Sequence, residues 1–169
     1  MANHIVLCHP AIPQNTGNIM RTCVATDTTL HLIKPLGFDL DDKKMKRAGL
    51  DYVKDLTMHV YENWEEFVEK NPGEYYFTTR YSKKNYCEFN MHEADKEHYF
   101  IFGHEHDGIP KEILKQHLDR CMRIPMTTKT RSLNVSNCVA LVLYEALRQQ
   151  NFPGLSFVET QKGENFLYE

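Results

Sequence analysis

Short, mostly apolar runs of residues alternate along the chain with longer segments in which apolar residues recur at helical spacing. The apolar runs predict buried strands at 4–8, 30–33, 75–79, 98–102 and 121–124. The segments between and after them predict helices at 15–25, 41–48, 63–70, 110–117 and from about 134 to 147. Alternating strands and helices are typical of βαβ units, so we expect one α/β domain, with a mostly parallel sheet and helices on both faces.

The last of these helices has an unusual composition. Residues 138–144 are apolar without a break, and a helix that is apolar all round is buried on all sides, by its own domain or by a partner chain. The loop before it is polar and carries Arg131, Ser132 and Asn134. Such a loop ends at a helix N-terminus with free backbone donors, so it predicts a binding site.

Composition narrows the possibilities without identifying a function. A length of 169 residues with 41% hydrophobic and 25% charged residues is typical of one globular domain. The net charge of −3 means that nucleic-acid binding would depend on local basic groups, such as Arg80 with Lys83 and Lys84, or Arg123 with Lys129 and Arg131. Five cysteines without a C-x-x-C pair, and no signal peptide or membrane span, lead us to expect a cytoplasmic protein.

Two further groups of residues follow predicted strands. Asn15 or Thr16 is the predicted cap of the first helix. Asn15, Asn18 and Arg21 stand three apart, so all three can point to one side near its N-terminal end, where open α/β sheets bind ligands; the alternative is a capping Asn15 with solvated neighbours. The segment 102–110 predicts a strand, a tight turn and a helix start. Within it, Gly103 would let backbone approach a ligand, and Gly108 would supply an unusual dihedral angle.

The same turn allows a different interpretation. His104, His106 and Asp107 could chelate zinc or iron, which would make the protein a metal-dependent hydrolase. The other histidines are scattered, however, and the Gly-x-Glu-x-x-Gly pattern explains the turn without a metal. We therefore expect no metal.

Three motifs together carry a family resemblance. They are Asn15-x-x-Asn18-x-x-Arg21, Phe102-Gly103-x-Glu105-x-x-Gly108-Ile-Pro, and Ile124-Pro-Met126 followed by Arg131-Ser-Leu-Asn134-x-Ser. In order and spacing, over about 5–150, they resemble the 2′-O-methylating branch of the SPOUT superfamily of RNA methyltransferases. The segments 12–18, 34–38 and 46–52 are similar to minimal members that modify the wobble nucleotide (cytidine or uridine 34) of tRNA.

The resemblance implies a fold and a cofactor. The fold is a single SPOUT-type domain, here 1–155, with a C-terminal trefoil knot, followed by a tail at 156–169. S-adenosylmethionine would bind in the knot loops and leave as S-adenosylhomocysteine. The positions that match those loops are Phe77, Thr78, Gly103, Ile124, Met126, Ser132 and Leu133.

The resemblance also implies a homodimer that buries the apolar helix, tRNA as substrate, and a set of catalytic residues. Arg21 would orient the ribose hydroxyl and its phosphate, held by Asn18 and Glu105, while Asn134 and Ser132 would line the path of the methyl group. Asp107 departs from the family, where a basic residue is common. A non-catalytic RNA-binding dimer is the second alternative to the enzyme.

Overall fold

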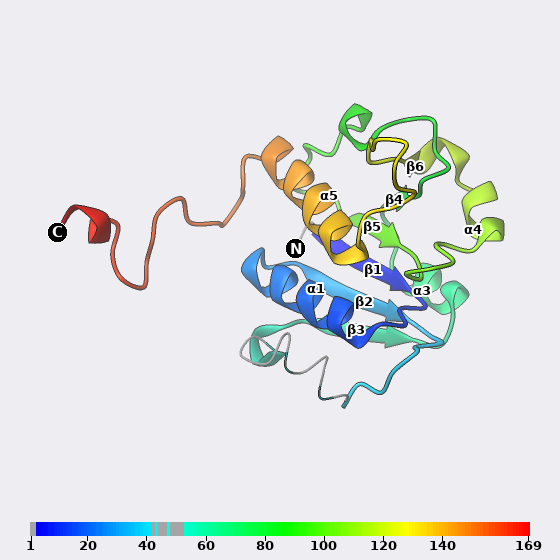
Figure 1. Ribbon diagram of the computed structural model, residues 1–169, viewed down its shortest axis with the longest axis horizontal. Coiled ribbons are helices and arrows are strands. Elements are labelled where there is room, and N and C mark those ends of the chain that lie inside the picture. The colour runs from blue at the N-terminus through cyan, green and yellow to red at the C-terminus, as the bar shows by residue number, and fades with distance from the viewer. Residues whose placement is uncertain (1–2, 42, 44–46, 48–52) are drawn as a thin grey trace.

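The computed structural model describes residues 3–41, 43, 47 and 53–169, and within them a single parallel sheet organises the chain (Figure 1). Its order is β3-β2-β1-β5-β4-β6, and every neighbouring pair of strands is parallel. The strands are β1 Asn3–Cys8, β2 Thr29–Ile33, β3 Met58–Tyr61, β4 Glu74–Thr78, β5 His98–Phe102 and β6 Cys121–Met122. The predicted α/β class is confirmed.

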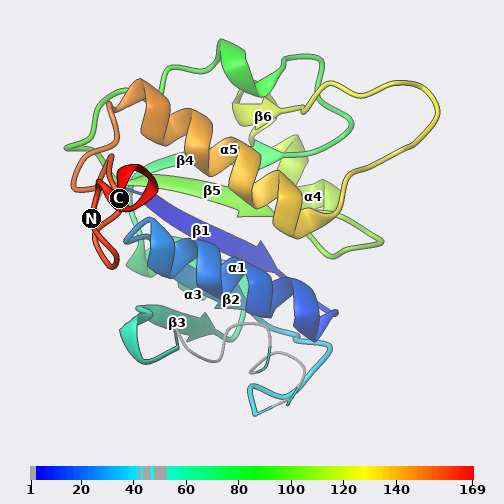
Figure 2. The same cartoon turned by 60° about the vertical axis from the view of Figure 1, so that its left-hand side comes forward.

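Helices cover both faces of the sheet, as expected. On one face α1 (Pro13–Ala25) and α5 (Val135–Gln149) lie side by side and bury Ile19, Cys23 and Val142, among others (Figure 2). On the other face α3 (Trp64–Lys70) and α4 (Lys111–Lys115) cover a cluster centred on aromatic side chains. The helix predicted at 41–48 lies largely outside the described residues.

The helix starts show which predicted N-caps are present. Asn63 caps α3, since its side chain accepts a hydrogen bond from the Glu66 amide, and Asn134 caps α5 in the same way through the Ser136 amide. The prediction that Asn15 or Thr16 caps α1 was wrong. That helix starts at Pro13 after Ile12, without a side-chain cap, and Asn15 is 7% exposed inside the first turn.

Two strands differ from the prediction. β3 was missed, because at the edge of the sheet it is only partly buried and gives no continuous apolar run. β6 has only two residues, because beyond Met122 the chain pairs on its other side: the Arg123 amide donates to the Lys84 carbonyl at 2.8 Å, and the Tyr86 amide donates to the Arg123 carbonyl at 2.9 Å. Segment 121–123 therefore lies between β4 and the 84–86 loop. The trefoil knot itself stays a prediction.

The apolar helix α5 is not buried on all sides within one chain. Its inner face is fully buried, whereas Leu141 and Tyr144 on its outer face are 42% and 44% exposed. After α5, Phe152 and Leu155 pack against the core, and every residue from 156 onward is exposed. Figure 1 shows this tail extending away from the sheet. The division into a domain at 1–155 and a tail stays a prediction.

No helix in the described part of the chain has the length and apolar character needed to cross a membrane. The five cysteines are all free thiols.

Candidate active site at the carboxyl edge of the sheet

The sheet has a switch point between β1 and β5, because β1, β2 and β3 add outward in one direction, and the chain then crosses to the other side of β1, where it forms β4, β5 between β1 and β4, and β6 outside β4. Open α/β sheets bind ligands beyond the carboxyl ends of the strands at such a point. A cavity of about 440 Å³ opens there, a volume suited to a small-molecule cofactor.

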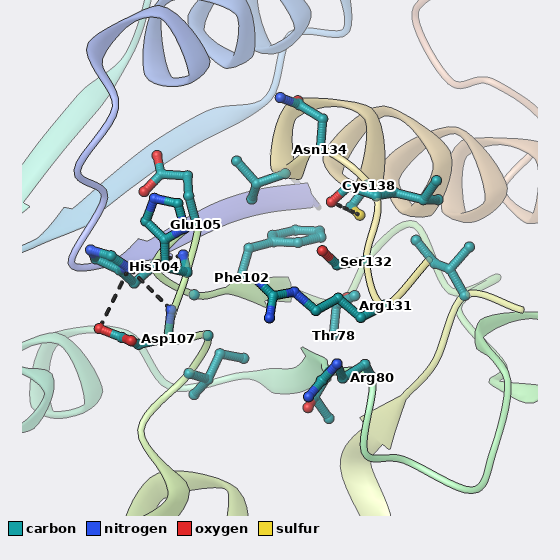
Figure 3. A pocket seen from close by; sticks show the side chains of 18 of the residues that line it. Thr78, Arg80, Phe102, His104, Glu105, Asp107, Arg131, Ser132, Asn134 and Cys138 are labelled. Carbon is teal, nitrogen blue, oxygen red and sulfur yellow. Dashed lines mark hydrogen bonds and ion pairs between the residues drawn. The ribbon is translucent and has the colours of Figure 1, made fainter. Parts of the chain in front are cut away.

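Segments that follow four different strands line this cavity (Figure 3). They are Ile12 and Asn15 after β1, 78–81 at the end of β4, 102–109 at the end of β5, and Ile124, Met126, 131–135 and Cys138 from the loop after β6 into the first turn of α5. The three motifs of the sequence thus meet in one place.

Glu105 joins two of these segments. Its carboxylate accepts the Ala11 amide at 2.9 Å and the Ile12 amide at 3.0 Å, and Asn15 Nδ2 lies 3.4 Å from it. Both oxygens therefore hold the β1–α1 loop. The sequence-based role for Glu105, holding Arg21, is not among these contacts and stays a prediction.

Asn15 extends the connection to the third motif. Its Oδ1 accepts a hydrogen bond from Asn134 Nδ2 at 3.0 Å, while Asn134 Oδ1 accepts the Ser136 amide at 2.9 Å. The resulting chain of contacts, Glu105 to Asn15 to Asn134, links residues 119 positions apart. It explains why Asn15 is buried, and it fixes the start of α5 against the start of α1.

The two glycines of the turn have separate tasks. A Cβ at Gly103 would lie 2.0 Å from the carbonyl carbon of Gly108 and 2.1 Å from the Ile109 nitrogen, so this glycine is required by the turn's own backbone. The packing of the turn is thus a second requirement for glycine here, beside the predicted place of Gly103 at the cavity, which it lines. Gly108 has φ of +72°, which confirms the unusual dihedral angle.

Six of the seven predicted cofactor positions line the cavity: Thr78, Gly103, Ile124, Met126, Ser132 and Leu133. The seventh, Phe77, is fully buried on the opposite face of the sheet, where its ring stacks on His117 with centroids 4.6 Å apart. Successive side chains of a strand point to opposite faces, so Phe77 and Thr78 cannot both face the cavity.

Thr78 has the property expected of a ligand contact. Its hydroxyl oxygen is buried and has no hydrogen-bond partner among the described residues. Buried polar groups are normally paired, so this oxygen at the cavity wall is suited to bind a ligand atom.

Asn18 and Arg21 are exposed and do not belong to the lining. An α-helix turns once in about 3.6 residues, so each step of three falls about 60° short of a full turn. Arg21 is therefore rotated by about 120° from Asn15 and lies about 9 Å further along the axis. The prediction that the three residues share one side was wrong for a single chain.

The cavity has a basic edge and a protonated thiol. Arg80 and Arg131 line it (Figure 3), and Arg123 donates a hydrogen bond to the Arg80 carbonyl. Burial raises the pKa of the Cys138 thiol to about 11. Tyr81 and Cys138 are lining residues that the sequence analysis missed; the basic group after β4 pointed toward Tyr81, whereas nothing local distinguished Cys138.

The histidines of the turn are not arranged around a metal. His104 Nδ1 accepts the backbone amides of His106 and Asp107 at 3.0 and 3.2 Å, so that nitrogen is engaged by the turn. Within the described ranges, no group of three or more His, Cys, Asp or Glu side chains is placed to hold a metal ion.

The sheet is parallel with this strand order, and loops from β4, β5 and β6 converge on a cavity at the switch point. These features define the fold as a SPOUT-type α/β domain. The chain belongs to the SpoU rRNA methylase family, whose family model matches residues 2–144.

The chain is similar along most of its length to named relatives. A tRNA (cytidine(34)-2′-O)-methyltransferase of Methylovorus glucosotrophus is 48% identical over 153 residues, covering 89% of this chain and 97% of the relative. A protein of Geobacillus stearothermophilus, provisionally named for the same activity, is 52% identical over 157 residues, covering 92% of this chain and 100% of the relative.

Solved structures agree with the fold. A crystal structure from Bacillus anthracis, provisionally described as an RNA methyltransferase, has a TM-score of 0.88 at 52% identity and covers 92% of this chain and 99% of its own. A structure that addresses 2-OH methylation of C/U34 on tRNA has a TM-score of 0.83 at 36% identity, covering 89% and 97%.

Proposed function

We propose that this protein transfers a methyl group from S-adenosylmethionine to the 2′-hydroxyl of nucleotide 34, a cytidine or uridine, in tRNA. The observation that carries the proposal is the convergence of three motif segments on one cavity, held by the Glu105–Asn15–Asn134 contacts. The names of relatives 48% and 52% identical to the chain support the substrate and the position. Such a reaction belongs in the cytoplasm.

The cavity fits the proposed cofactor. Ile124, Met126 and Leu133 offer an apolar wall for an adenine ring, and the unpaired Thr78 hydroxyl and Ser132 offer polar contacts. Bound there, S-adenosylmethionine would supply an electrophilic methyl group, and S-adenosylhomocysteine would be the product. The side chains of this cavity would then orient the donor and exclude water.

The ribose hydroxyl is a weak nucleophile at neutral pH, so a cationic or basic group must favour its alkoxide. We assign this role to Arg21. A guanidinium keeps its proton at neutral pH, so it acts by orienting the hydroxyl and the neighbouring phosphate. Asn18 would position Arg21, and Asn134 and Ser132 would line the path of the methyl group.

A second copy of the chain would bring Arg21 to the cavity. The outward face of α1 carries Asn18 and Arg21, and the outward face of the adjacent α5 carries Leu141 and Tyr144. These helices lie side by side (Figure 2). Their outward faces together therefore form one partly apolar surface. A homodimer packed on this surface would cover the exposed part of α5 and place the partner's α1 next to the cavity.

The decisive experiment is to incubate the purified protein with bulk tRNA and labelled S-adenosylmethionine, then map the modified nucleotide. We expect label on the 2′-oxygen of nucleotide 34 and none on tRNA that carries 2′-deoxyribose there. Label elsewhere would reject the proposed position. Metal in the purified protein, together with an activity that is lost on chelation, would favour the metal-dependent hydrolase. Absence of S-adenosylmethionine binding in calorimetry would favour the non-catalytic RNA-binding dimer.

The role of Arg21 has its own test. Arg21→Ala should abolish turnover and leave the affinity for S-adenosylmethionine unchanged. Ser132→Trp should block the cavity from an exposed position. Co-expressed under two tags and purified as a mixed dimer, the two inactive variants should regain up to half of the wild-type activity, because one composite site is intact. A mixed dimer as inactive as its parents would reject the supply of Arg21 from a second copy.

A further inference from the structure

An exposed aromatic ring lies at the edge of the cavity. Tyr81 follows β4, lines the cavity, and is 73% exposed. Phe102 also lines the cavity but is 2% exposed and belongs to the core. Of the Phe, Trp and Tyr side chains described along the cavity wall, Tyr81 is therefore the one that offers its ring to solvent.

The ring is held in place by its neighbours. Arg80 Nη2 donates to the Tyr81 hydroxyl at 2.9 Å, and its guanidinium carbon lies 4.8 Å from the ring centroid. The Tyr81 amide donates to Thr79 Oγ1 at 3.3 Å, and Ser82 Oγ donates to the Cys121 carbonyl at 2.7 Å. The short turn that carries Tyr81 is thus tied to β6.

This exposure has no evident benefit for stability, since a ring in solvent buries little apolar area. Single-stranded RNA, in contrast, is bound by aromatic rings that stack on bases and by guanidinium groups that hold phosphates. Tyr81 with Arg80 supplies both groups at the mouth of a cavity, and Arg123 is bonded to the same turn.

We infer that Tyr81 is a stacking platform for a nucleobase of the anticodon loop next to the reacting ribose, with Arg80 holding the adjoining phosphate. The inference rests on the proposed function and names the residue that positions its substrate. Every base has a π face, so stacking tolerates a change of base. Such a platform therefore suits an enzyme that accepts either cytidine or uridine at one position.

The test compares Tyr81→Ala and Tyr81→Phe with Tyr168→Ala as the matched control, because Tyr168 is another tyrosine, 84% exposed, in the tail. Stacking on one aromatic ring predicts a rise in the KM for tRNA of about tenfold to a hundredfold in Tyr81→Ala. Tyr81→Phe keeps the ring and should stay within about twofold of wild type. Neither variant should change the affinity for S-adenosylmethionine, and Tyr168→Ala should match wild type.

A second readout does not depend on turnover. An anticodon stem-loop with 2-aminopurine beside position 34 should lose fluorescence on binding to the wild-type protein, because the base stacks, and should keep it with Tyr81→Ala. An unchanged KM, or a loss of S-adenosylmethionine affinity equal to the loss for tRNA, would overturn the inference. If the wild-type protein methylates no tRNA, the proposed function fails, and the quenching alone decides whether Tyr81 binds a base.

Discussion

Replacement of Glu105 by glutamine tests whether the contacts between the motifs hold the site together. The carboxylate accepts two backbone amides, from Ala11 at 2.9 Å and Ile12 at 3.0 Å. Glutamine has a single carbonyl oxygen and a donor group in place of the second oxygen. One of the two amides must then face another donor, so at least one hydrogen bond is lost.

The size of the effect follows from these contacts. A hydrogen bond to a charged group contributes about 1.5–3 kcal/mol, and an amide left unpaired costs about 1–3 kcal/mol. Asn15 Nδ2, at 3.4 Å, adds little. We therefore expect Glu105→Gln to lower the free energy of unfolding by about 2–3 kcal/mol. For a chain of this length that corresponds to a fall in Tm of roughly 4–12 °C.

Thermal unfolding of the two variants Glu105→Gln and Glu112→Gln at equal concentration measures this difference. Glu112 is an exposed glutamate on α4 and should stay within about 1 °C of wild type, as surface substitutions usually do. Calorimetry should also show weaker binding of S-adenosylmethionine to Glu105→Gln, because the loop after β1 is released from the cavity wall. A Tm equal to that of Glu112→Gln, with unchanged cofactor binding, would refute the proposed role of these contacts.

Three further predictions follow from single residues. Burial, and then the neighbouring His4 and His59, lower the pKa of His31 from 6.5 to about 3. The unfolded chain takes up this proton first, so the free energy of unfolding should fall by about 1.4 kcal/mol per pH unit as pH drops below about 6.5 toward 3. The free energy of unfolding of His31→Gln, measured by urea titration at each pH, should depend less steeply on pH. With the Cys138 pKa raised to about 11 by burial and Cys87 exposed, Ellman's reagent should label one thiol rapidly at pH 7.5, and Cys87→Ser should remove that phase; a rapid phase that persists would contradict this. Gly103→Ala should lower Tm more than Glu105→Gln and abolish cofactor binding, because its Cβ meets backbone at 2.0 Å. Gly154→Ala has nothing within 4 Å of its Cβ and only the strain of φ at +75°, so it should cost far less; equal losses would contradict the close packing of the turn.

The central strands were predictable because both faces of the sheet are covered. β1, β2 and β5 are buried at every position and therefore appear in the sequence as mostly apolar runs, although they also bury polar residues such as His4, His31 and His98. β3 lies at the edge and is only partly buried, so its four residues carry no such pattern. The length of β6 depends on the distant 84–86 loop, which no local pattern reveals.

Part of the site was also predictable, because a parallel sheet brings the carboxyl ends of its strands to one edge. Residues near the carboxyl ends of the strands, such as Thr78 and Gly103, reach the cavity because the topology requires it. The side chain of Phe77 could have been placed away from that of Thr78, since strand alternation puts the two on opposite faces, whereas a contact through the Phe77 backbone stays a prediction. Asn15 could not have been assigned, because an asparagine at a helix start has the same local pattern whether it caps the helix or, as here, contacts Glu105 and Asn134.

Asn15 and Arg21 belong to one sequence motif, but the structure places them on different parts of the surface of α1. Asn15 lies at the cavity and fixes the turn after β5 against the start of α5, whereas Arg21, two turns later on the same helix, lies on the outward surface with Asn18. One helix thus serves its own cavity with its first turn, and its later turns face away from it. If Arg21 is catalytic, as we propose, its exposure and the exposed apolar face of α5 have a common explanation. In the proposed dimer, the surface that buries Leu141 and Tyr144 would also deliver the guanidinium to the neighbouring cavity.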